Sequence, residues 1–147
     1  MAQDHSSPAT QPSDGKTPPR RRVGPRRSQA STDAVLDAAY GELAEQGWRG
    51  FSVDRVAKSA RASKQTIYRW WKTPACLAVE SVLRRVPEGR SAQDARDRIS
   101  AVIEPMLLML RSGDGAHAWR GALLAAADDE AAGELFRGWF GERIKAP

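Results

Sequence analysis

Residues 52–71 read SVDRVAKSARASKQTIYRWW, and this stretch decides the fold. It predicts two short helices joined by a tight turn, because Ser52 and Ser63 stand where a serine side chain can cap a helix. In the second helix, Ile67 and Trp71 are four residues apart and therefore share one inward side. The stretch therefore has the pattern of a helix-turn-helix unit.

The outer face of that second helix carries cationic, amide, hydroxyl and phenol groups and no carboxylate. These residues are Lys64, Gln65, Thr66, Tyr68 and Arg69. Such a helix fits the major groove of DNA, where amide and guanidinium groups read base edges while hydroxyls and cations hold phosphates. The alternative is an ordinary solvated face, since amphipathic helices with polar outer faces occur in any helical domain.

The charge of the chain is placed unevenly. The 147 residues have a net charge of +5. Residues 1–30 carry six Lys/Arg against two Asp/Glu, residues 31–86 nine against six, and residues 87–147 eight against ten. Basic charge that gathers around the predicted recognition helix favours binding to a polyanion, because a charge needed only for solubility has no reason to segregate.

Residues 1–30 contain almost no apolar side chains, so we expect a disordered basic arm. Five arginines cluster just before the first helix: Arg20, Arg21, Arg22, Arg26 and Arg27. They predict an arm that follows phosphates or enters the minor groove. The alternative is a solvated tail.

The rest of the chain is predicted to be helical, with no β-alternation and no repeat, so the fold class is all-α. Ser31 or Thr32 is expected to cap the first helix and Gly47 to end it. Pro105 is expected to kink a long helix. The helices are predicted at residues 32–46, 53–59, 63–70, 74–86, 91–111, 117–127 and 130–144.

The sequence offers no chemistry typical of an enzyme. His117 stands alone and His5 lies in the predicted arm, so no metal pair or catalytic triad is available. The single cysteine, Cys76, fits a reducing compartment. No apolar run is long enough to span a membrane and no signal core is present. We therefore expect a cytoplasmic protein without enzyme activity, metal or cofactor.

Residues 31–77 resemble the DNA-binding domain of the tetracycline-repressor (TetR) family of bacterial transcriptional regulators. The matching segments, in order, are Glu45-Gln46-Gly47-Trp48, Phe51-Ser52-Val53, Val56-Ala57, the run from Ala62 to Trp71, and Leu77. The resemblance implies an all-α protein whose N-terminal three-helix unit binds operator DNA. Residues 78–147 would form part of a helical domain that binds an inducer and pairs two subunits.

The resemblance also implies which residues contact double-stranded DNA. Ser52 and Tyr68 match phosphate contacts, and Thr73 caps a helix whose N-terminal amides can face a phosphate. The positions matched to DNA contacts are Ser52, Lys64, Gln65, Thr66, Tyr68, Arg69, Trp70 and Thr73.

Two residues depart from the family pattern. Arg61 stands in the turn between the two short helices, where the family usually has glycine. A positive φ at that position would cost about 1 kcal/mol for a residue with a Cβ. Pro74 replaces the usual lysine after the cap of the fourth helix, so one phosphate contact is expected to be lost.

Members of the family generally continue through two further long helices that pair with a partner subunit, and we expect this chain to lack them. The leading hypothesis is a ligand-responsive repressor whose homodimer is weak. Alternatives are a shortened remnant that binds DNA weakly and non-specifically, and, least favoured, an enzyme. An inducer pocket would be lined by Met106, Met109, Leu110, Trp119 and Phe136, although such residues at these spacings are more often core.

Overall fold

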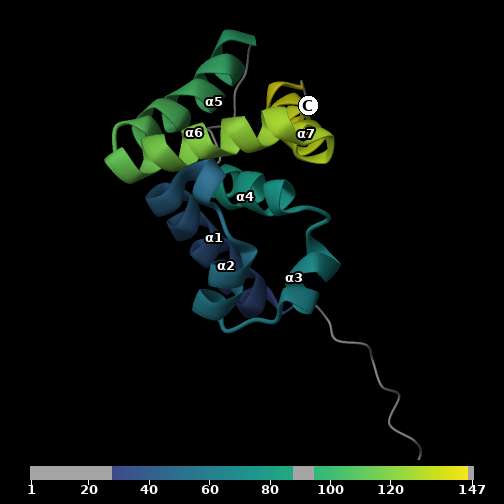
Figure 1. Cartoon of the computed structure of the whole chain (residues 1–147). Helices are drawn as coiled ribbons and strands as arrows, with labels where there is room; N and C mark the ends of the chain where they lie inside the picture. Colours follow the sequence, from purple (N-terminus) through teal and green to yellow (C-terminus); the bar gives the residue numbers. More distant parts are fainter. Residues whose placement is uncertain (1–27, 88–94, 146–147) are drawn as a thin grey trace, which may run out of the picture.

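A computed structural model describes residues 28–87 and 95–145, and this part of the chain contains seven helices and no strand. The expected all-α class is therefore confirmed. The helices in order are α1 (Gln29–Gly50), α2 (Val53–Ala60), α3 (Lys64–Trp70), α4 (Pro74–Leu83), α5 (Ala95–Leu110), α6 (Gly113–Asp128) and α7 (Glu130–Ile144). In Figure 1, α1, α2 and α3 form one half of the molecule, α5, α6 and α7 form the other, and α4 lies between them.

The first helix differs from the prediction at both ends. It begins at Gln29, inside the segment expected to be a disordered arm, because the Oγ of Ser28 accepts a hydrogen bond from the Ser31 N–H at 3.1 Å and caps it. The expected cap at Ser31 or Thr32 is therefore wrong. Gly47, at φ +65° and ψ −179°, interrupts the helix, which resumes for a few residues as far as Gly50.

Other helix ends also differ from the prediction, again for local reasons. α4 ends at Leu83 rather than near residue 86. α6 begins at Gly113 rather than residue 117, because the Oγ of Ser112 accepts a hydrogen bond from the Gly115 N–H at 3.0 Å. The segment expected as a turn is thus the first turn of α6. Pro105 lies inside α5.

Two clusters of buried side chains hold the molecule together. The first joins α1, α2 and α3 and includes Leu36, Val56 and Ile67. The second joins the C-terminal half of α1 to α4, α6 and α7, and Leu43 lies in it. α4 crosses the expected boundary after Leu77 and contributes to both clusters. The helix-turn-helix unit is therefore packed directly on the C-terminal helices.

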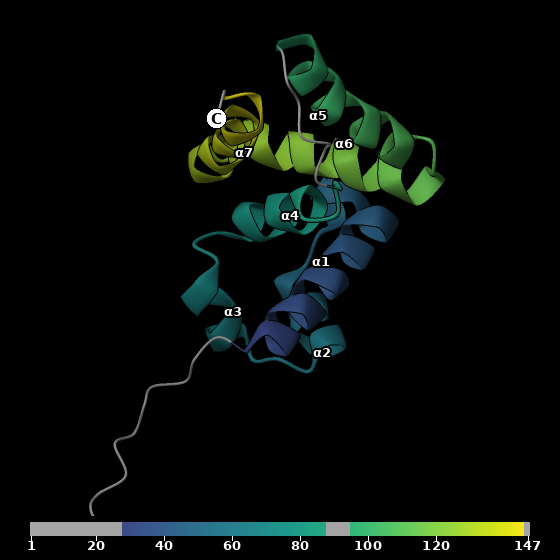
Figure 2. The ribbon, with the colours of Figure 1, turned by 180° about the vertical axis from the view of Figure 1, so that it is seen from behind.

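α6 packs closely on α1. A Cβ added to Gly121 of α6 would lie 2.6 Å from the Cδ1 of Leu43, so the two helices meet where α6 has no side chain. The Trp48 Nε1–H donates a hydrogen bond to Asp128 Oδ2 at 2.9 Å. Figure 2 shows α6 lying across α1 from behind. Because Leu43 is fully buried here, its burial contributes about 1.5–3 kcal/mol to stability.

Candidate nucleic-acid interface

Both short helices of the helix-turn-helix unit are capped as the sequence predicts. The Oγ of Ser52 accepts a hydrogen bond from the Arg55 N–H at 3.4 Å. The Oγ of Ser63 accepts one from the Thr66 N–H at 3.0 Å and lies 2.8 Å from the Thr66 hydroxyl. These bonds fix where α2 and α3 begin, and so set which residues of α3 point outward.

The turn between α2 and α3 places Arg61 in the left-handed region, at φ 51° and ψ 38°. The Ala62 N–H donates to the Ala57 carbonyl at 2.9 Å, and the Arg61 N–H donates to the Lys58 carbonyl at 3.3 Å. This pair of bonds ends the helix in the Schellman manner, in which glycine is preferred. The positive φ considered for Arg61 is therefore confirmed, and the arginine bears its steric cost.

α3 separates an inner and an outer face. Ile67 is 1% exposed and Trp71, which ends the helix, is 3% exposed. Tyr68 and Trp70 are 49% and 40% exposed although they are aromatic. The outward residues, all exposed, are Lys64, Gln65, Thr66, Tyr68, Arg69 and Trp70. These are the residues of α3 that the sequence analysis predicted to contact DNA.

One carboxylate lies beside this row. Lys64 Nζ is 2.7 Å from Asp54 Oδ1 of α2, and both side chains are exposed. The hydrogen bond to Asp54, together with its charge, raises the pKa of Lys64, so the lysine stays protonated. The sequence analysis did not identify this pair, because Asp54 comes before the turn and only the folded unit brings it to the start of α3.

The remaining predicted contacts of this unit lie at its edges. The Oγ1 of Thr73 accepts a hydrogen bond from the Cys76 N–H at 3.1 Å, so it caps α4 as expected. Arg55, which was not among the predicted contacts, is paired with α1: its Nε–H donates to Glu42 Oε1 at 2.7 Å. That hydrogen bond raises the pKa of Arg55.

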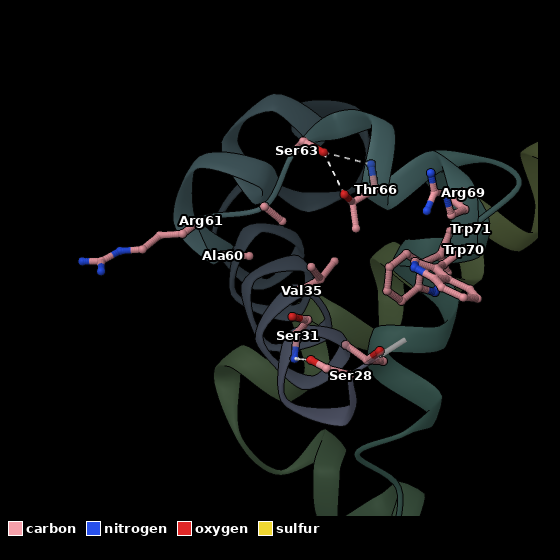
Figure 3. Close-up of a pocket in the computed structure, with 12 residues that line it drawn as sticks. Ser28, Ser31, Val35, Ala60, Arg61, Ser63, Thr66, Arg69, Trp70 and Trp71 are labelled. Atoms are coloured by element: carbon pink, nitrogen blue, oxygen red, sulfur yellow. Dashed lines mark hydrogen bonds between the residues drawn. The ribbon is translucent and has the colours of Figure 1, made fainter. Parts of the chain in front are cut away.

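A hollow of about 330 Å³ lies between the start of α1 and the outer side of α3, and we call it the front hollow. Figure 3 shows Ser28 and Ser31 on one side and Thr66 opposite them. Arg69 and Trp70 lie along a third side, whereas the Arg61 side chain extends away. Hydroxyls and a cation therefore border a cavity next to α3, and the sequence analysis did not place Ser28 and Ser31 there.

The other predicted site residues fall into two groups. The arm arginines Arg20, Arg21, Arg22, Arg26 and Arg27 lie outside the described residues. The candidates for an inducer pocket, Met106, Met109, Leu110, Trp119 and Phe136, all belong to or pack against the second cluster. The rings of Trp119 and Phe136 are 5.8 Å apart. The fold thus brings these five residues together as core, and their role in ligand binding stays a prediction.

Within residues 28–87 and 95–145, no group of three or more His, Cys, Asp or Glu is placed to hold a metal ion. In the same residues, every helix is too short or too polar to cross a membrane.

Comparison with known proteins agrees with this geometry. Residues 35–75 match the family described as bacterial regulatory proteins, tetR family. The chain is also 31% identical over 80 residues to an uncharacterized HTH-type transcriptional regulator, YdeS, of Bacillus subtilis (strain 168). That alignment covers 54% of this chain and 40% of the relative, so the chain spans less than half of the relative's length. Through the helix-turn-helix unit of residues 35–75, the chain is similar to the tetR family of bacterial regulatory proteins.

Proposed function

We propose that the protein is a DNA-binding transcriptional regulator that places α3 in the major groove. The observation that carries this proposal is the exposed row of cationic, amide and hydroxyl groups on α3, held outward by the burial of Ile67 and Trp71. A short helix presented in this way is how helix-turn-helix proteins reach base edges. Its position inside the matched family domain favours DNA over other polyanions.

Within this proposal, the residues divide by the group of DNA that they contact. Lys64, Gln65 and Thr66 at the start of α3 contact base edges or the nearest phosphates. Tyr68, Arg69 and Trp70 contact the backbone or the groove wall, and the N-terminal amides of α2 and α4, capped by Ser52 and Thr73, face phosphates. Residues 31–77 form the DNA-binding unit in this proposal, and residues 78–147 belong to a regulatory part.

The front hollow would receive a segment of the DNA backbone. Ser31 and Thr66 offer hydroxyl donors on its two sides, and Arg69 offers a guanidinium. Donors of this kind are the ones that hold phosphate oxygens and fix the register of a protein on the duplex. The basic N-terminal arm, with its five arginines, would continue along the neighbouring groove.

The regulatory part of the proposal follows from the family resemblance. We propose a cytoplasmic repressor that releases DNA when a small molecule binds, with two chains pairing on a two-fold site.

Selection of bound DNA from a random pool, repeated at two salt concentrations, tests the proposal. We expect enrichment of one related set of sequences at both concentrations, because base contacts persist when phosphate contacts are screened. Binding that loses all sequence preference and falls steeply with salt would support non-specific attraction instead. No binding at low salt would refute the proposed function.

A further inference from the structure

The first cation of α3 is paired with a carboxylate of the preceding helix. Asp54 is the sole acidic residue of residues 52–71, a stretch that also contains five Lys/Arg. It lies in the first turn of α2, and its Oδ1 is 2.7 Å from the Nζ of Lys64, the first residue of α3. The one acid of this stretch therefore stands at the end of α3 that the proposed function directs at base edges.

This ion pair differs from the pair that Arg55 makes. Arg55 pairs with Glu42, whose side chain is only 10% exposed, and also donates to the Gly50 carbonyl, so it is tied to α1. The side chains of Lys64 and Asp54 are 57% and 71% exposed. An exposed ion pair contributes little to stability, so this one does little to hold α3 in place. Both of its members are open to a duplex that lies on α3.

The chemistry of the Lys64–Asp54 pair favours a neutral acceptor over an anionic one. An ammonium group has three N–H donors, so Lys64 can keep Asp54 as one acceptor and donate the others to a base edge. Guanine presents two neutral acceptors, O6 and N7, in the major groove, and lysine bonds to both. A phosphate oxygen is anionic, and the adjacent carboxylate of Asp54 repels it. The pair therefore has no net attraction for phosphate but keeps its donors for a base.

We propose that Asp54 is a specificity-determining residue, which directs Lys64 to a guanine of the bound DNA and away from phosphates. This inference rests on the proposed function and adds to it the base that Lys64 contacts. The neutral pair contributes to sequence preference without raising the affinity for all DNA. Phosphate attraction is left to the cations of this stretch that form no ion pair within residues 28–87 and 95–145, which are Lys58, Arg61 and Arg69.

Two duplexes test the proposal: the sequence selected from the random pool, and a shuffled duplex of the same length and composition. The affinity of the full chain for each is measured over a range of salt concentrations. We expect Asp54→Asn to bind the shuffled duplex at least about threefold more tightly at low salt, because a repulsive charge is removed and Lys64 is free to contact a phosphate. The slope of log affinity against log salt concentration should steepen by about 0.9 on this duplex. The preference for the selected duplex should fall at least about twofold, because Lys64 gains no new contact there.

Asp37→Asn is the matched control. Asp37 Oδ1 is also 2.7 Å from a cation, the Nη2 of Arg85, and its side chain is also 71% exposed, but this pair joins α1 to α4. The control removes the same charge from the chain without freeing a cation of α3, so its salt slope and sequence preference should match those of the parent. Both variants should unfold thermally within a few degrees of the parent, since both pairs are exposed.

Two variants of Lys64 separate the pair from the single charge. Lys64→Gln should lose the preference for G·C at one position when the selection from the random pool is repeated with it. Asp54→Asn combined with Lys64→Gln should return to the parent's salt slope, because no freed lysine remains to contact a phosphate.

Three results would overturn the proposal. Asp54→Asn could change the affinities for both duplexes by the same factor with an unchanged slope, which would limit Asp54 to a structural part in α2. Lys64→Gln could select the same bases as the parent. Asp37→Asn could steepen the slope as much as Asp54→Asn, which would show an effect of net charge alone. A parent that binds neither duplex at low salt would instead refute the proposed function, and this inference with it.

Discussion

The left-handed conformation of Arg61 predicts that glycine at this position stabilises the protein. A left-handed residue with a Cβ costs about 1–2 kcal/mol, and Arg61, at φ 51°, bears this cost while ending α2. Glycine removes it but loses roughly 0.4–1 kcal/mol through the greater freedom of the unfolded chain. We therefore expect Arg61→Gly to be more stable than the parent by about 0.5–1 kcal/mol.

The matched control is Arg61→Ala, which removes the same exposed side chain but keeps the Cβ. Loss of an exposed arginine alone changes stability by no more than about 0.5 kcal/mol, so the alanine variant should lie close to the parent. Thermal unfolding followed by far-UV circular dichroism should place the glycine variant about 2–4 °C above the alanine variant. Equal midpoints for the two variants would refute the reasoning, because both lack the arginine and only one retains the strain.

The other predictions concern DNA contact and packing. Lys64→Ala and Tyr68→Ala should each weaken DNA binding without lowering the unfolding temperature, because both side chains are exposed; parent-like affinity at moderate salt would contradict the assignment of α3. Deletion of residues 1–27 should lower DNA affinity. It should also flatten the slope of log affinity against log salt concentration by about 0.9 for each phosphate that the arm neutralises, and an unchanged slope would leave the arm without a role. Gly121→Ala should destabilise the fold by about 1–3 kcal/mol in denaturant titration, because its Cβ would meet Leu43, whereas Gly138→Ala, with open space around it, should not.

Many features of the site follow from neighbouring residues, and these were predictable. Ser52, Ser63 and Thr73 cap their helices as the sequence predicts, because a cap involves a hydroxyl and an N–H only two or three residues away. The outward row of α3 follows from the spacing of Ile67 and Trp71. The expected cap of the first helix, Ser31 or Thr32, was wrong: Ser28 is the cap, and Thr32 is buried within α1.

The sequence by itself determined that the chain is helical, where the recognition helix lies and which of its residues face outward. Only the tertiary structure decided what lies beside that helix. The pairing of Lys64 with Asp54, the bond from Trp71 to Glu80 and the contact of Leu43 with Gly121 each join different helices. The physical reason is that apolar faces of similar size can pack in several arrangements, and helical periodicity shows which face is buried without showing against which partner. The front hollow between α1 and α3 depends on how these helices pack, and so it exists only in the folded chain.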